Sequence, residues 1–67
     1  MKNEAFLTEK AWEAIELARH EALKGDMVMT HYHLGRLDAF TYLLGYPKKL
    51  NQPFYDILTL LSANEKF

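Results

Sequence analysis

The sequence contains no cysteine, so neither a disulfide nor a thiolate metal site can staple the fold. Only three histidines remain as soft metal ligands, and we expect no zinc site. A chain of 67 residues buries only about 60% of the surface that its unfolded form exposes, so its stability margin is thin. Association with a second molecule is the remaining way to stabilise the fold. A hydrophobic content of 49% supplies enough apolar residues for both a small core and a contact surface.

The sequence also lacks an excess of positive or negative charge, and it lacks long apolar runs. Eight Lys and Arg residues face nine Asp and Glu residues, for a net charge of −1. A nucleic-acid binder usually concentrates its basic residues, but only Lys48 and Lys49 are adjacent here. No apolar run approaches the roughly 20 residues of a membrane span, and the N-terminal segment lacks the apolar core of a signal peptide. These absences predict a cytoplasmic protein without a membrane segment, whose main partner is not nucleic acid.

The chain does contain helical periodicity, which predicts an all-α fold of three helices with the second helix central. No segment alternates cleanly between apolar and polar residues, so we expect no sheet and a single domain over residues 1–67. Thr8 is the expected cap of the first helix, with an earlier start near Asn3 as the alternative. Gly25 is the expected end of this helix.

Local signals also delimit the other two helices. The second is expected to start at Thr30 and to end at Gly45, whose lack of a side chain suits a left-handed terminal position. The third is expected to open with Asn51 or Gln52 as the cap and Pro53 in the first turn, and to fray after Leu61.

The same periodicity assigns a core face to each helix. The predicted core residues are Ala11, Trp12, Ala14, Ile15, Ala18, Ala22 and Leu23 in the first helix, Leu34, Leu37, Phe40 and Leu44 in the second, and Phe54, Ile57, Leu58 and Leu61 in the third. Four alanines in the first helix allow close approach of a neighbour. We expect the rings of Trp12 and Phe40 to be buried, and Glu9, Glu13 and Glu16 to form a solvated stripe.

The second helix has a second apolar side, made of Tyr32, Ala39 and Leu43. Either the first and third helices cover both sides, or one side meets a second molecule. Gly35 lies between the sides and costs roughly 1 kcal/mol relative to alanine, so we expect it to relieve a crossing with the first or third helix, with a recognition groove for a partner as the alternative. The predicted partner-binding residues are Tyr32, Gly35, Asp38, Ala39, Tyr42 and Leu43, and the simplest partner is a second copy related by a two-fold axis.

The two histidines of "HYH" do not indicate a metal site. Residues two apart on a helix point about 200° apart, so His31 and His33 cannot share one ion. We expect His33 to be half-buried and hydrogen-bonded. His31 and Asp38 are separated by about 10 Å along a helix, too far for a catalytic hydrogen bond. With no nucleophile–base pair and no cofactor loop, the sequence predicts a protein that is not an enzyme and has no catalytic, cofactor or metal residues.

These observations favour a small intracellular protein-interaction module. We expect it to regulate or inhibit another protein through a helix face and to self-associate, most simply as a homodimer. Small single-domain chains of this kind are often bacterial or phage regulators, which is an analogy rather than a derivation. The alternative is a small dimeric DNA-binding transcription regulator, although the second helix is too apolar for a recognition helix.

Overall fold

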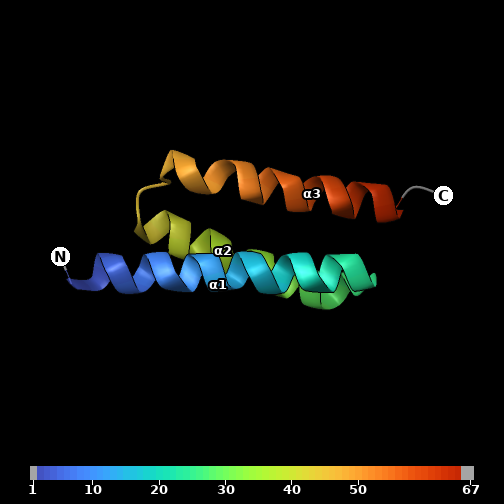
Figure 1. Ribbon diagram of the computed structural model, residues 1–67, viewed down its shortest axis with the longest axis horizontal. Helices are drawn as coiled ribbons and strands as arrows, with labels where there is room; N and C mark the ends of the chain where they lie inside the picture. The colour runs from blue at the N-terminus through green and yellow to red at the C-terminus, as the bar shows by residue number, and fades with distance from the viewer. Residues whose placement is uncertain (1, 66–67) are drawn as a thin grey trace.

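The computed structural model describes the backbone of residues 2–65 and the side chains of residues 3–63. Its elements, in chain order, are α1 (Lys2–Lys24), α2 (Met27–Leu43), a short 3-10 turn η1 (Lys48–Leu50) and α3 (Asn51–Glu65) (Figure 1). The described part of the chain contains no strand. The prediction of a small all-α domain with three helices is therefore confirmed.

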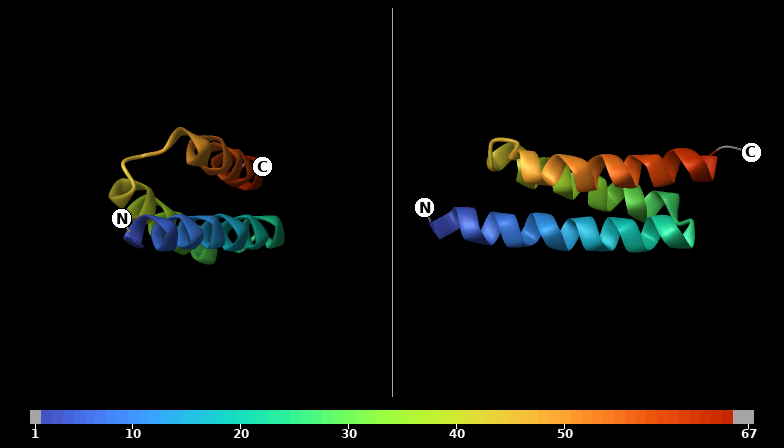
Figure 2. Two further views of the ribbon diagram at one scale, coloured as in Figure 1. Left: turned by 60° about the vertical axis from the view of Figure 1, so that its left-hand side comes forward. Right: turned by 45° about the horizontal axis from the view of Figure 1, so that its top comes forward.

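The helices run up, down and up along one long axis. A tight turn joins α1 to the antiparallel α2, and a longer loop carries the chain over to α3 (Figures 1 and 2). α1 runs beside both other helices, with the antiparallel α2 against it on one side and α3 on another (Figure 2). The packing is uneven, because α1 lies against α2 along much of its length, whereas α3 packs less extensively and mainly on α1.

All three helices differ from the predicted bounds, and α3 begins at Asn51 itself and continues past Leu61 to Glu65. α1 begins at Lys2, one residue before the alternative start at Asn3, because the residues before Thr8 contain no helix breaker. α2 begins at Met27 because Asp26, not Thr30, is the N-cap, and its carboxylate accepts a hydrogen bond from the Met29 amide at 3.1 Å.

Both predicted glycine stops are confirmed. Gly25 and Gly45 have φ values of +84° and +80°, in the left-handed region that other residues rarely adopt. After Gly45 the amide of Tyr46 donates to the Thr41 carbonyl at 2.7 Å, and the amide of Gly45 donates to the Tyr42 carbonyl at 3.1 Å. This pair of bonds is a Schellman motif, which satisfies the last carbonyls of α2.

The core is built largely from small side chains of α1. Its buried hydrophobic residues are Ala11, Ala14, Ile15, Ala18, Ala22, Leu34, Leu37, Leu50, Ile57 and Leu61. Phe40 is partly buried and packs against this core. The prediction for Trp12 is wrong, since 39% of its surface is exposed, and Leu23 and Leu58 are exposed too. Trp12 lies at the margin of the alanine face of α1, and the neighbouring helices do not cover that margin fully.

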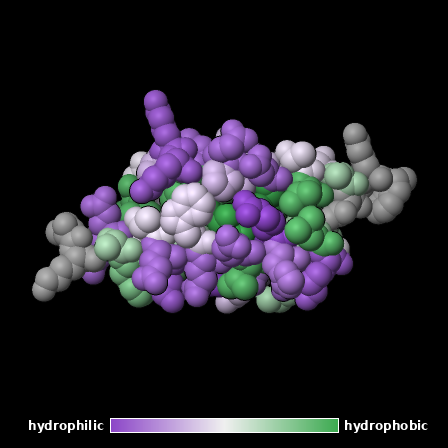
Figure 3. Space-filling model, in the orientation of Figure 1, coloured by the Kyte–Doolittle hydropathy of each residue, from purple (hydrophilic) through white to green (hydrophobic). Residues whose placement is uncertain are grey.

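The side of the molecule shown in Figure 3 is largely hydrophilic, with hydrophobic patches toward the end where α3 finishes. Glu9, Glu13 and Glu16 are exposed along α1, as expected for a solvated stripe. The polar residues that are buried among the described side chains all have hydrogen-bond partners.

Candidate protein-interaction site

The side of α2 that faces away from α1 is an exposed and largely apolar surface. It consists of Val28 (79% exposed), Tyr32 (58%), Gly35, Ala39, Tyr42 (67%) and Leu43 (63%), which we call the outer seam of α2. The opposite side of the same helix carries its buried residues, Thr30, His33, Leu34, Leu37 and Thr41. Of the two arrangements that the sequence allows, the structure has the one in which this second apolar side is uncovered by the described helices.

The outer seam has the spacing of a helix–helix contact. Val28, Tyr32, Gly35, Ala39 and Tyr42 recur at intervals of four, three, four and three residues. Apolar residues at this spacing line one side of a helix and pack into the seam of a neighbouring helix in a coiled coil. Val28 is not among the predicted site residues, because the second helix was expected to start at Thr30. With Asp26 as the N-cap, Val28 falls within the helix and on this side of it.

Gly35 lies in the middle of the outer seam, and no other described element packs against it. A methyl group built on it would meet no described heavy atom within 4 Å beyond the local helix backbone. Gly35 therefore does not relieve a crossing with α1 or α3. Because a mid-helix glycine costs stability, this unoccupied notch marks the place where another backbone could approach α2 most closely.

Arg36 holds one flank of the outer seam in place. Its guanidinium lies 5.9 Å from the ring centroids of Tyr32 and Phe40, one helical turn away on either side. Arg36 Nη2 also lies 3.6 Å from Oε1 of Glu13 on α1, and Nη1 donates to Nδ1 of His33 at 3.2 Å. These contacts fix the side chains on this flank against α1.

The two histidines lie on different sides of α2, as predicted. His31 is exposed, whereas His33 is 7% exposed and hydrogen-bonded to Arg36. Within the described residues no group of three His, Cys, Asp or Glu side chains could hold a metal ion. The prediction for His33 is confirmed in direction, and the side chain is more fully buried than expected.

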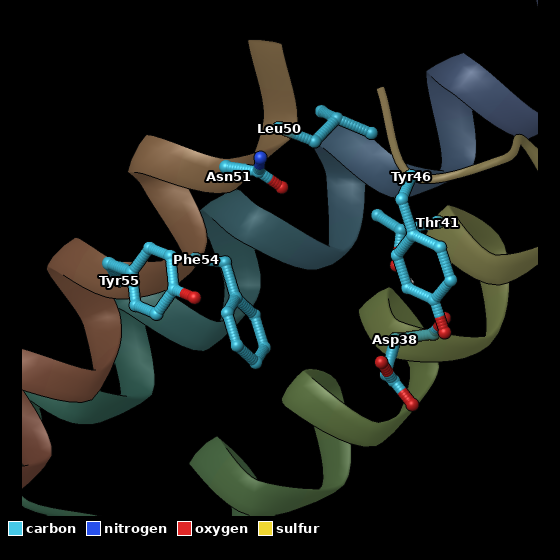
Figure 4. A pocket seen from close by; sticks show the side chains of 7 residues that line it. All are labelled: Asp38, Thr41, Tyr46, Leu50, Asn51, Phe54 and Tyr55. Atoms are coloured by element: carbon cyan, nitrogen blue, oxygen red, sulfur yellow. Dashed lines mark hydrogen bonds between the residues drawn. The ribbon is translucent and has the colours of Figure 1, made fainter. Parts of the chain in front are cut away.

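A hollow of about 160 Å³ adjoins the outer seam between α2 and α3 (Figure 4). Its lining residues come from α2, the loop, η1 and α3, and they are Asp38, Thr41, Tyr46, Leu50, Asn51, Phe54 and Tyr55. Of the predicted site residues only Asp38 lines it. The aromatic residues of this hollow could not be predicted from the sequence. They come from separate segments that meet only in the folded chain, and their spacing along the sequence shows no pattern.

A second hollow of about 290 Å³ lies where the first turns of α1 meet the end of α2. Leu43 of the outer seam lines it together with Asn3, Glu4 and Leu7 from α1. The outer seam is therefore bordered by hollows on both sides of its C-terminal half, one toward α3 and one toward α1. The predicted partner-binding residues form one continuous exposed side of α2 in this arrangement.

No family model, curated protein or solved structure matches this chain. No helix in the described residues combines the length and apolarity needed to cross a membrane. The outer seam of α2 and its surroundings are therefore the features of this chain that bear on its function.

Proposed function

We propose that this chain is a small intracellular protein-interaction module that binds another protein through the outer seam of α2 and also self-associates through it. One observation carries the proposal: a long helix buries one side and exposes a second apolar side at coiled-coil spacing. Soluble monomers rarely leave a contiguous apolar surface of this kind exposed unless it is a contact site.

The composition of the seam supports a close helix–helix contact. Gly35 and Ala39 are small, and Tyr32 and Leu43 are large and exposed on either side of them. Small residues let two helices approach, and aromatic residues contribute much of the energy of protein interfaces. Binding of this kind changes a partner by covering part of its surface, which is the action of a regulator or inhibitor.

We do not extend the proposal to DNA. The outer seam carries no lysine or arginine, and the neighbouring Arg36 contacts Glu13. A groove-reading helix needs basic or polar side chains that reach base edges and phosphates. Binding of random duplex DNA that weakens steeply with salt would contradict this argument.

Sedimentation equilibrium on the wild type and Ala39→Arg tests the proposal. Arginine at the centre of a helix–helix contact leaves a buried, unpaired charge that costs several kcal/mol, so we expect a wild-type dimer and a monomeric variant. Ala63→Arg is the matched control, because Ala63 is exposed in α3 away from the seam, and this variant should dimerise normally.

Circular dichroism must accompany the measurement. Ala39 is exposed within one chain, so Ala39→Arg should keep the helical spectrum of the wild type. A wild type that stays monomeric at high micromolar concentration contradicts self-association. An Ala39→Arg chain that loses its helical signal as a monomer means that the seam is intramolecular core, which contradicts the proposal as a whole.

A further inference from the structure

The hollow between α2 and α3 has the size of a site for one side chain. Its volume of about 160 Å³ is below the roughly 300–1,000 Å³ of sites that take a drug-sized molecule. It forms because α3 packs on α1 more than on α2, and the loop after α2 closes one side of the opening (Figure 4). The hollow therefore suits a group that a partner inserts, rather than a free metabolite.

The charge in this hollow is negative and unpaired. Asp38 is the only charged residue among those that line it, and its carboxylate has no hydrogen-bond or ion-pair partner among the described residues. Asp56 accepts a hydrogen bond from Gln52, and Glu13 pairs with Arg36, whereas Asp38 shares its lack of a partner with exposed carboxylates of α1 and differs from them in lining this hollow. A cationic ligand is the natural complement to Asp38.

Three of the residues that line the hollow are aromatic. Tyr46 stands on one side and pairs edge-to-face with Tyr42, with ring centroids 6.2 Å apart. Phe54 and Tyr55 stand on the other side and form a second edge-to-face pair at 5.9 Å (Figure 4). Ring faces carry negative potential and attract cations, and a guanidinium group stacks on such faces more readily than an ammonium group.

The backbone fixes Tyr46 at this position. Tyr46 has a φ of +56°, an uncommon value for a residue with a side chain, and its amide is held by the Thr41 carbonyl at 2.7 Å. An unusual conformation persists only where the surroundings enforce it, and here the Schellman end of α2 does so. This backbone conformation sets the direction in which the Tyr46 side chain leaves the chain, and its ring lies beside Asp38 (Figure 4).

We propose that this hollow binds the guanidinium group of an arginine that a partner protein presents, with Asp38 as its counter-ion and Tyr46, Phe54 and Tyr55 as its stacking surfaces. The assignment of the arginine to a protein partner rests on the proposed function, whereas binding of the guanidinium group does not. Asp38 follows the centre of the outer seam on the same helix, so a partner lying along the seam could reach the hollow with one side chain.

A titration followed by ¹⁵N NMR tests the proposal on the full chain. The probe is N-acetyl-arginine amide, whose one charge is the guanidinium group, and the matched neutral probe is N-acetyl-citrulline amide. We expect the arginine probe to shift amide signals between residues 38 and 55 with a millimolar Kd, and the citrulline probe to leave them unchanged. Asp38→Asn should weaken binding at least about fivefold, because it removes the ion pair.

Asp56→Asn is the control, since Asp56 is an exposed carboxylate on α3 outside the hollow, and it should bind the probe like the wild type. If Asp38→Asn does not fold, Tyr55→Ala removes a largely exposed ring and should weaken binding by a similar factor. Equal shifts with the citrulline probe, or an Asp38→Asn titration identical to wild type, would overturn the proposal.

Inorganic phosphate is the third probe. If phosphate shifts these amides and the arginine probe does not, the hollow is an anion site at the start of α3, and the proposal is wrong. The titration is independent of sedimentation: a dimeric wild type without arginine binding removes only this inference, and a monomeric wild type that binds the arginine probe removes only the self-association.

Discussion

Replacing Gly35 separates two effects of this residue, its effect on the stability of the folded chain and its effect on self-association. A methyl group at Gly35 meets no described atom within 4 Å, and the residue lies in the interior of α2. Gly35→Ala should therefore stabilise the folded chain by roughly 1 kcal/mol. In a domain of this size that corresponds to an increase in Tm of about 4–8 °C, measurable by circular dichroism at low protein concentration.

The same substitution should weaken self-association in sedimentation equilibrium, because a methyl group keeps the two helices apart where they approach most closely. Gly45→Ala is the contrasting variant: Gly45 has a φ of +80°, so alanine there is strained and should lower Tm. A Gly35→Ala variant that dimerises as well as the wild type would mean that no backbone approaches this notch.

Residue types predicted some local features well and others poorly. Gly25 and Gly45 were correct stops, because their conformations depend on the absence of a side chain. The start of α2 was wrong, because Asp26 and Thr30 are both good caps and periodicity does not decide between them. The burial of Trp12 was also wrong, since a helical wheel gives the direction of a side chain but not where the neighbouring helix ends.

At the scale of the elements, α3 is the least firmly attached helix. It packs less extensively than α1 and α2 pack on each other, and Ile57 and Leu61 are its buried anchors. Elements with fewer buried contacts open at lower free energy than the rest of a domain. We expect the central amides of α3 to exchange with deuterium at least about tenfold faster than the central amides of α1 in native-state hydrogen exchange.

Ile57→Ala should widen this difference, because Ile57 is fully buried, whereas Thr59→Ala at an exposed position of α3 should not. Equal protection of all three helices would show that the domain opens as one unit. The number of helices and the glycine stops at Gly25 and Gly45 could be predicted, because the conformation of a terminal glycine is set locally. The preference of α3 for α1 could not be predicted, because it depends on side chains distant in sequence, including the buried Leu50 of η1.

The whole molecule is long and thin, and its Cα atoms extend over 45 × 18 × 13 Å. Such a shape has a narrow interior, filled here largely by alanine, so the folded monomer has little stability to spare. If the outer seam pairs two copies, folding is linked to association by mass action. We expect Tm to rise by several degrees for each tenfold increase in protein concentration.

Ala39→Arg should remove this concentration dependence, and Ala63→Arg should retain it. A Tm that is constant over two orders of magnitude in concentration would contradict the homodimer. The sequence predicted that Tyr32, Gly35, Asp38, Ala39, Tyr42 and Leu43 share one side of a helix, and in α2 they do so and are exposed, because helical spacing fixes which residues share a side. It did not predict the hollow beside them, because that depends on how α3 is placed in space.

The contacts of Arg36 have a consequence for the kinetics of binding. Tyr32 is exposed, yet the guanidinium of Arg36 lies against its ring, and the ring of His33 meets it edge-on at 5.1 Å. A side chain that is already restrained loses less rotational freedom when it becomes an interface residue, so less of the contact energy is spent on ordering it. Such preorganisation should lengthen the lifetime of a complex formed on α2 more than it speeds the encounter, since differences among related complexes lie mostly in the dissociation rate.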